Sequence, residues 1–287
     1  MKLSVVVPVY NEERYILGLL QSLYTGVRVP DEVIVADGRS EDYTVELIKR
    51  HYPQVIVVNN PERNAACGRN HALKRAGGDV IAFTDGDNVA DRNWLSEIER
   101  AFLRYRVDGV GGRMDLMPSA NRYEAFWGNL EWRSLREYGG KPLLVEGHDF
   151  RHTFVTANCA YTRDILVKLH GFDPYFANNG EDYDLCWRAA DAGARLLYVP
   201  SAVIYAHCVD TVQGIAKKSF RNGISSCKLQ KRYGSRFNFD PNIYRMLGGN
   251  VKGLLTGKED ADLNVLELVC HLGGKYYGSA KFHVLNF

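Results

Sequence analysis

The sequence lacks most of the short motifs that identify nucleotide and hydrolase sites. It has no GxxxxGK[ST] P-loop, no GxGxxG after its first apolar run and no GxSxG elbow. No two of its six cysteines form a CxxC pair, which argues against the usual zinc and redox sites and against a disulfide framework. The familiar ATP-binding, dinucleotide-binding and serine-hydrolase sites are therefore set aside.

Long apolar runs and a strong net charge are also missing. No stretch approaches the ~18 apolar residues of a membrane span, and the run 3–9, which is broken at Pro8, is too short for a signal-peptide core. A net charge of +2 over 287 residues argues against a nucleic-acid partner. We expect a cytoplasmic protein with reduced thiols, or one held at the cytoplasmic face of a membrane.

The first ~115 residues alternate between short apolar runs and amphipathic segments. Such alternation predicts a mostly parallel sheet with helices on both faces. In the first helix Asn11 is a plausible cap, and Ile16, Leu19, Leu20 and Leu23 share one face. The expected strands lie at 3–9, 32–36, 54–58, 79–84 and 109–116.

Asp85-Gly86-Asp87 follows the expected strand 79–84 directly. Strands of an open α/β sheet bind ligands at their carboxyl ends, so both carboxylates should lie at that edge. Hard oxygen ligands suit Mg²⁺ or Mn²⁺ holding a diphosphate. The triplet therefore predicts a metal and nucleotide site, although the same spacing also occurs at 182–184 and 260–262.

Three further segments offer groups for a nucleotide. Tyr10 can stack on a base, and Asp37 can accept hydrogen bonds from a base N–H. The helix that opens near Gly68 presents backbone N–H groups to phosphate, and Arg69 can pair with diphosphate oxygens. Structural roles compete with each of these: Asn11 as a helix cap, Asp37 in a turn, and Arg69 on a solvated helix face.

The order of these motifs resembles the family-2 inverting glycosyltransferases, which have the GT-A fold with a Rossmann-like half. The resemblance covers about residues 3–210. The matching segments are 5–12 (VVVPVYNE), 33–38 (VIVADG), 68–70 (GRN), 77–87 (GGDVIAFTDGD), 171–174 (GFDP), 180–185 (GEDYDL) with Arg188, and 199–207 (VPSAVIYAH).

The resemblance implies roles for individual residues. Asp182 would be the catalytic base, paired with Glu181. Asp87 would bind the metal, Asp85 would contact the ribose or share the metal, and His207 would complete the metal shell. The positions implied to bind the nucleotide are Pro8, Tyr10, Glu12, Asp37, Arg69, Asp85 and Arg221.

One position departs from the family. Members often carry two consecutive acids after the second strand, and here the first is Ala36. Only Asp37 remains for the base, so the donor stays open between UDP- and GDP-linked sugars. We interpret Asp184 and Arg188, one helical turn apart, as a structural ion pair.

Residues 211–239 contain seven Lys and Arg and no Asp or Glu. This segment is a solvated helix face, a phosphate clamp through Arg221, or a contact for an anionic membrane surface together with an amphipathic stretch at 263–277. In that stretch Val265, Leu268, Val269, Leu272 and Tyr276 fit a helical stripe.

These observations predict a GT-A catalytic domain over 1–211, with a nucleotide-sugar-binding half (1–116) and an acceptor-side half (117–211). A basic, mainly helical region follows at 212–287. We expect a metal-dependent hexosyltransferase that uses a UDP- or GDP-sugar and a glycan or polyprenyl-linked acceptor. The alternatives are a non-catalytic carbohydrate- or nucleotide-binding module and a sugar-phosphate nucleotidyltransferase.

Overall fold

The computed structural model describes residues 1–131, 140–148, 153–177, 179–234 and 242–284. Within these residues the chain forms two compact units. The first takes its residues from 1–117, 132–177 and 181–207, and the second from 118–131, 178–180 and 208–287.

A single sheet forms the centre of the first unit. Its strands follow the order β3-β2-β1-β4-β8-β6-β9-β5, and β7 also pairs with β9. The strands are β1 (Leu3–Val9), β2 (Glu32–Asp37), β3 (Ile56–Asn59), β4 (Val80–Phe83), β5 (Asn88–Ala90), β6 (Gly109–Leu116), β7 (Leu143–Val145), β8 (Cys159–Thr162) and β9 (Leu196–Ala206).

The two halves of this sheet differ in strand direction. β3, β2, β1 and β4 are all parallel. β8 then lies antiparallel between β4 and β6, while β6 and β9 are parallel again. The mixed α/β architecture agrees with the expectation, but antiparallel β8 separates the expected strand 109–116 (β6) from the four parallel strands.

The helices of the first unit are α1 (Ile16–Tyr24), α2 (Thr44–His51), α3 (Ala65–Leu73), α4 (Trp94–Tyr105), α6 (Arg163–Lys168) and α7 (Glu181–Asp191). The expected apolar face of α1 is confirmed, since Ile16, Leu19, Leu20 and Leu23 are buried.

The start of α1 differs from the expectation. Asn11 does not cap the helix, which begins at Ile16. Its backbone has φ +56°, and its side-chain Oδ1 accepts a hydrogen bond from Glu41 N at 2.8 Å. Asn11 is therefore used to hold the loop after β2 instead of the helix end.

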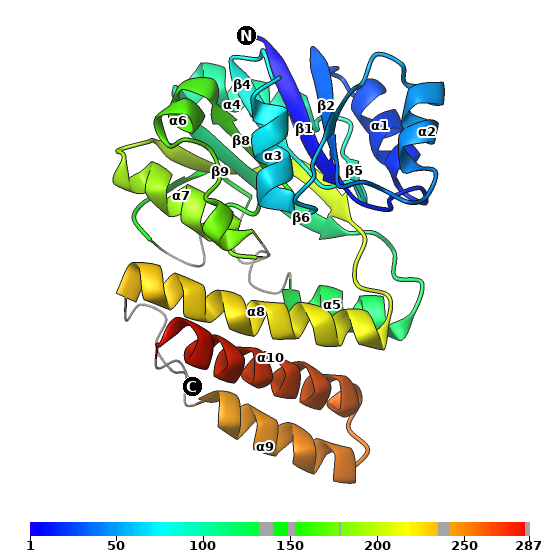
Figure 1. Ribbon diagram of the computed structural model, residues 1–287, viewed down its shortest axis with the longest axis vertical. Helices are drawn as coiled ribbons and strands as arrows, with labels where there is room; N and C mark the ends of the chain where they lie inside the picture. Colours follow the sequence, from blue (N-terminus) through cyan, green and yellow to red (C-terminus); the bar gives the residue numbers. More distant parts are fainter. Residues whose placement is uncertain (132–139, 149–152, 178, 235–241, 285–287) are drawn as a thin grey trace. The chain divides into compact units, whose positions relative to one another are not determined.

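The chain changes direction across the sheet between β3 and β4. The connections β1–α1–β2 and β2–α2–β3 step one way along the strand order, and β3–α3–β4 steps back past β1. Because parallel crossovers are right-handed, α3 packs on the face opposite to α1 and α2, and in Figure 1 it lies in front of the sheet. The carboxyl ends of β1 and β4 consequently form the switch point where such sheets bind ligands.

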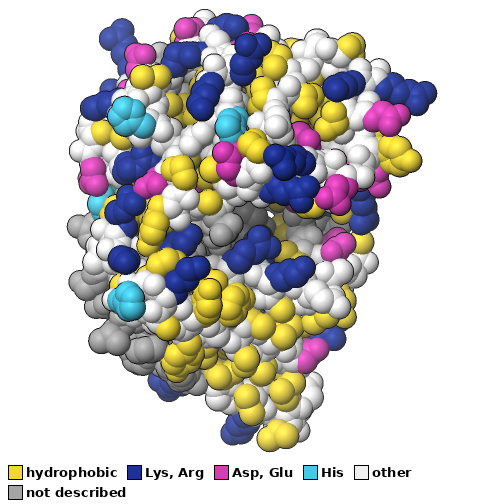
Figure 2. All heavy atoms as spheres, viewed as in Figure 1, with side chains coloured by type: hydrophobic (Ala, Val, Ile, Leu, Met, Phe, Trp, Pro, Cys, Tyr) yellow, Lys and Arg dark blue, Asp and Glu magenta, His cyan; other side chains and the backbone are white. Residues whose placement is uncertain are grey.

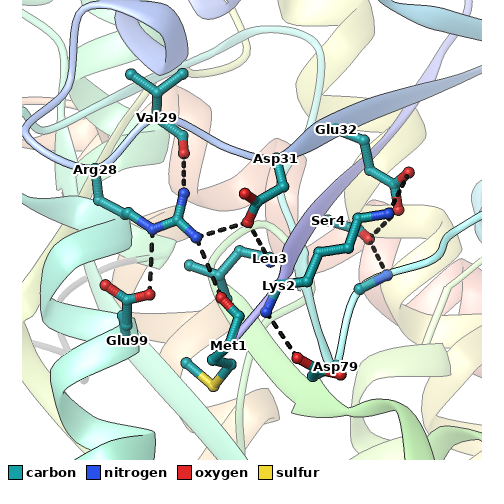
Figure 3. Close-up of polar contacts among 11 residues, drawn as sticks. Met1, Lys2, Leu3, Ser4, Arg28, Val29, Asp31, Glu32, Asp79 and Glu99 are labelled. Carbon is teal, nitrogen blue, oxygen red and sulfur yellow. Dashed lines mark hydrogen bonds and ion pairs between the residues drawn. The ribbon is translucent and has the colours of Figure 1, made fainter.

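Ion pairs and hydrogen bonds join the segments at the amino-terminal ends of the parallel strands (Figure 3). The amide of Leu3 donates to Asp31 at 2.7 Å, and Arg28 pairs with both Asp31 and Glu99. Glu32 accepts from Ser4 Oγ at 2.6 Å. These contacts satisfy polar groups at the beginning of β1, and none of them involves its carboxyl end.

The second unit is helical. It contains α5 (Arg122–Glu131), α8 (Val212–Tyr233), α9 (Asn242–Leu255) and α10 (Ala261–Phe282). One core cluster joins α5, α8 and α10 through Phe126, Trp127, Ile215 and Leu263. None of the helices in the described residues is both long and apolar enough to cross a membrane.

Helices α8 and α10 approach each other closely at glycine. A Cβ on Gly274 would lie 2.0 Å from the carbonyl oxygen of Phe220, so no larger residue fits there. This contact turns Leu268 and Leu272 inward but leaves Val269 and Tyr276 each 51% exposed. The expected helix exists, but the expected stripe was wrong in part because backbone contact selects the buried face.

Candidate functional site

The carboxyl ends of β1 and β2 carry the residues expected to bind a base. Pro8 pairs with Ala36 across the two strands. Tyr10 is 45% exposed, and the Arg63 guanidinium lies 5.5 Å from its ring centroid. Asp37 closes β2 and accepts a hydrogen bond from Ser40 N at 3.1 Å. A partly exposed aromatic ring, with a guanidinium over it, therefore stands next to a carboxylate at the sheet edge.

Carboxylates gather beside β4. A Cβ on Gly86 would lie 2.9 Å from Val9 Cγ1 and 3.1 Å from Glu12 Cγ, so the loop after β4 packs tightly against the end of β1. Burial, followed by the negative charges of Asp87 and Asp85, raises the pKa of Glu12 to about 8. Three acidic side chains thus share one negatively charged corner, which is the kind of environment that attracts a cation.

Strand register brings Asp87 towards His207. Asn88 of β5 pairs with Ala206 of β9 in an antiparallel ladder, so the residues just beyond this pair, Asp87 and His207, lie at the same end of it. The His207 ring also packs against Tyr15, with 4.6 Å between the ring centroids. Among the described residues, however, no three His, Cys, Asp or Glu side chains form a group that could hold a metal ion by themselves.

Arg69 lies at the centre of the site. It comes from α3, only 2% of its side chain is exposed, and its Nη2 donates to Asp85 Oδ1 at 2.7 Å. Its Nη1 donates to Glu181 Oε1 at 2.9 Å. One buried guanidinium therefore links the loop after β4 to the first residue of α7.

Asp182 is the next residue of α7, and its environment is unusual for a carboxylate. Burial, followed by the charge of Glu181, raises the pKa of Asp182 to about 7. The Tyr183 amide and the Arg69 charge act in the opposite direction. A carboxylate with a pKa near neutrality is suited to general acid–base chemistry.

The neighbouring acid on α7 has a structural role. Asp184 is fully buried and accepts from Arg188 Nε at 2.7 Å, which confirms the expected ion pair. Arg188 also donates to the carbonyl oxygens of Leu169 and Gly171, both at 2.9 Å. The pair fastens α7 to the loop that precedes Phe172.

The sequence reasoning did not assign a role to Asn70 or Phe172. The Asn70 amide group donates to the carbonyl of Phe172 at 2.7 Å and accepts from its N–H at 2.9 Å. The ring of Phe172 lies 5.5 Å from the Arg69 guanidinium carbon. The matching segments 68–70 and 171–174 contain both residues, but only the fold reveals that they bind each other.

The first unit thus brings together six of the expected positions: Glu12, Arg69, Asp85, Asp87, Glu181 and Asp182. Arg221 is different, because it is an exposed residue of α8 in the second unit. Its contact with a diphosphate stays a prediction. Arg236 of the basic segment lies outside the described residues.

The fold is found in solved glycosyltransferases of the GT-A class. Staphylococcus aureus TarS 1–349 in complex with UDP superposes with a TM-score of 0.59 over 96% of this chain and 91% of that one, at 18% identity. A mannosyltransferase of Pyrobaculum calidifontis, PcManGT, in complex with GDP-Man and Mn²⁺, gives a TM-score of 0.61 over 94% of this chain and 87% of that one, also at 18% identity. At such identities the likeness establishes the fold.

The sequence itself establishes the family. Residues 4–168, more than half of the chain, match the model of glycosyl transferase family 2, and the chain belongs to this family. The pre-mycofactocin glycosyltransferase of Mycobacterium tuberculosis is 30% identical over 80% of this chain. Glycosyltransferase AglE of Haloferax volcanii is 27% identical over 77% of this chain. The chain spans about half of the mycobacterial protein (48%) and 71% of AglE.

Proposed function

We propose that the first unit transfers a hexose from a UDP- or GDP-linked sugar to an acceptor hydroxyl, with inversion at the anomeric carbon. The observation that carries the proposal is the meeting of Asp85-Gly86-Asp87 and Glu181-Asp182 at one sheet edge, where Arg69 touches both. Membership of family 2 supports the reaction class. The acceptor would be a glycan or a polyprenyl-linked molecule, consistent with glycan biosynthesis.

In this proposal Asp182 is the general base. Its carboxylate takes the proton of the acceptor hydroxyl while the acceptor oxygen forms a bond to the anomeric carbon. The bond from that carbon to the diphosphate breaks on the opposite side, and its electron pair leaves with the nucleoside diphosphate. A base whose pKa is about 7 is ionised in half of the molecules at neutral pH and still binds a proton well.

Tyr10 and Asp37 would hold the base of the nucleotide. The exposed ring of Tyr10 offers a stacking surface, and the carboxylate of Asp37 would accept from a base N–H. Uracil and guanine both present such a donor, so this pair of residues is compatible with either nucleotide. Pro8, next to Ala36 in the ladder, would lie beside the nucleotide base.

A divalent cation fits the corner formed by Glu12, Asp85 and Asp87, where negative charge accumulates. Asp87 and His207 would be its ligands from the protein, with Asp85 shared between metal and ribose. Mg²⁺ and Mn²⁺ sites at diphosphates use one or two carboxylates and complete their shell with phosphate oxygens. When bound, the cation would neutralise the charge of the leaving diphosphate.

Thermal unfolding with nucleotides tests this proposal. The protein is heated with UDP, GDP, CDP or dTDP, each with and without Mn²⁺. A nucleotide at 100-fold over its dissociation constant adds about 2.7 kcal/mol to the free energy of unfolding. A rise that needs Mn²⁺ and favours UDP or GDP supports the proposal and names the donor class.

The two alternatives give other outcomes in the same experiment series. A shift with nucleotide, but no release of nucleoside diphosphate from any sugar donor, would favour a binding module. Release of pyrophosphate from a nucleoside triphosphate and a sugar phosphate would favour a nucleotidyltransferase. No shift with any of the four nucleotides at millimolar concentration would contradict the proposed transferase.

We further propose that region 212–287 lies against an anionic membrane surface. Residues 208–287 contain twelve Lys and Arg but only six Asp and Glu. On α9 the apolar side chains of Met246, Val251 and Leu254 are exposed, and Leu255 is 86% exposed. Figure 2 shows apolar side chains gathered over α9 and α10. Exposed apolar side chains on a basic helical unit are typical of peripheral binding to anionic lipid.

Vesicle sedimentation tests this contact. The full chain should sediment with phosphatidylserine-containing vesicles, less with pure phosphatidylcholine, and less again at high salt. The double variant Leu254→Asp/Leu255→Asp should stay in the supernatant. Leu103→Asp, at a site that is 67% exposed on α4 of the first unit, is the matched control and should still sediment. Equal sedimentation of all three proteins would refute the proposed contact.

A further inference from the structure

Arg69 has the geometry of a residue that connects two parts of a site. Its side chain is 2% exposed, so the guanidinium must be paired inside the protein. The two partners, Asp85 and Glu181, lie 16 and 112 residues away along the chain. They belong to the two sides of the proposed reaction: Asp85 to the donor, Glu181 to the helix that carries the base.

The same geometry leaves little of Arg69 for a ligand. Each terminal nitrogen already donates to a carboxylate at 2.7–2.9 Å, and Nε is buried without a hydrogen-bond partner in the described residues. The Phe172 ring lies over the guanidinium at 5.5 Å. A diphosphate would need an exposed fork of donors, and this side chain does not present one.

The surroundings hold Arg69 in place from several directions. Asn70, the next residue of α3, makes two hydrogen bonds to the backbone of Phe172. Phe172 in turn packs edge-on against Phe83 of β4, with 5.2 Å between the ring centroids. Helix α3 thereby fastens the end of β4, the 171–174 segment and the start of α7 to one another.

We infer that Arg69 is a positioning residue for the general base, and that it links the donor loop to Glu181-Asp182 instead of binding the diphosphate. This inference rests on the proposed transfer reaction. Its physical basis is that the Glu181 carboxylate, held by Arg69, fixes the first turn of α7 and hence the position of Asp182. A displacement of about 1 Å at a reacting group costs roughly 100-fold in rate.

The test compares wild type with Arg69→Met, Arg69→Lys and Glu181→Gln, the last of which breaks the same link from its other end. Arg75→Met is the control, because Arg75 is exposed two residues beyond the end of α3. Affinity for UDP and GDP with Mn²⁺ is measured by calorimetry. Turnover is measured as nucleoside diphosphate released from the sugar donor.

The expected result is a split between rate and affinity. Arg69→Met and Glu181→Gln should lower kcat by about 100-fold while the nucleotide Kd and donor KM change by less than about threefold. The acidic limb of the kcat–pH profile should also move to higher pH in Arg69→Met, because a cation that favours ionised Asp182 is lost. Arg69→Lys should restore part of the rate and move the limb back.

The opposite split overturns the inference. If Arg69→Met weakens UDP or GDP by more than tenfold at an unchanged kcat, Arg69 is a diphosphate ligand. If Arg69→Met does not fold, Arg69→Lys and Glu181→Gln give the same comparison. Absence of turnover in the wild type is a different result, since it overturns the proposed function and the inference with it.

Discussion

The two ends of the parallel strands carry acidic residues in opposite electrostatic states. At the amino end, the Leu3 amide and then the Arg28 guanidinium hold the pKa of Asp31 below its usual value. At the carboxyl end, burial and neighbouring acids raise the pKa of Glu12 to about 8 and that of Asp182 to about 7. The ionised form of Asp31 at the amino end stabilises the folded protein, whereas the ionised forms of Glu12 and Asp182 at the carboxyl end destabilise it.

Glu32 illustrates why the amino end is structural. Burial alone would raise its pKa, but hydrogen bonds from Ser4 Oγ and Gly77 N, together with Lys2, lower it. Every carboxylate there has a donor that favours its charge. At the carboxyl end Arg69 pairs with Asp85 and Glu181, whereas burial and neighbouring acids oppose the charged forms of Glu12 and Asp182. Such imbalance is typical of binding and catalytic sites.

The largest expected effect is on catalysis at the carboxyl end. Asp182→Asn removes the proposed base and should lower transfer by about 10²–10⁴-fold, with the affinity for nucleotide and metal unchanged. Released nucleoside diphosphate and calorimetry measure the two quantities. Asp164→Asn, an exposed acid in the first turn of α6, is the control and should keep full activity.

The same variant should not lose stability. Asp182 has a raised pKa in the folded state, so the wild type loses folding free energy as pH rises from about 4 to about 7. Asparagine carries no such charge. In denaturant unfolding, the free energy of unfolding of Asp182→Asn should therefore exceed that of the wild type by an amount that grows over this pH range and then levels off. A variant that is less stable than wild type at pH 8 would contradict the comparison.

The pH dependence of wild-type turnover is the second prediction. Only ionised Asp182 can accept a proton, so kcat should fall roughly tenfold per pH unit below a limb at about 7. The profile is measured with saturating donor in buffers of constant ionic strength. A limb near pH 4, as for an exposed aspartate, would mean that the site does not hold Asp182 in the environment described.

A smaller effect is expected from Gly86→Ala. The new methyl group would overlap Val9 Cγ1 at 2.9 Å and crowd Glu12 Cγ at 3.1 Å. We expect a loss of about 1–3 kcal/mol in stability and a weaker nucleotide-dependent shift in thermal unfolding. Gly18→Ala on α1 is the matched control, since nothing lies within 4 Å of its Cβ; it should be neutral or stabilising.

The smallest effect belongs to the amino end. Asp31→Asn weakens the hydrogen bond to Leu3 N and the pair with Arg28, and should cost on the order of 1 kcal/mol without changing kcat. Because the pKa of Asp31 is lowered by folding, this stability is present above pH ~4 and disappears as pH falls through the folded value. Denaturant unfolding at pH 7 and pH 3 measures both the loss of stability and its dependence on pH. A fall in the kcat of Asp31→Asn would contradict a purely structural role for the amino end.

Local pattern determined much of the parallel half of the sheet. The alternation of apolar runs and amphipathic segments predicted β1 to β4 and their helices, because side-chain periodicity is a local property. The placement of Asp85 and Asp87 after a buried strand also followed from position alone. The ion pair of Asp184 and Arg188 was predictable for the same reason, since residues four apart meet on a helix.

Contacts between distant segments were decided only by the tertiary structure. The sequence alone indicated that Arg69 could meet a diphosphate, but its burial between Asp85 and Glu181 depends on how α3, β4 and α7 pack. The buried face of α10 likewise depends on a glycine contact with α8. Periodicity specifies which residues share a face, whereas packing selects which face is buried and which charges meet. The raised pKa of Asp182 follows first from burial by that packing and then from the charge of its neighbour Glu181.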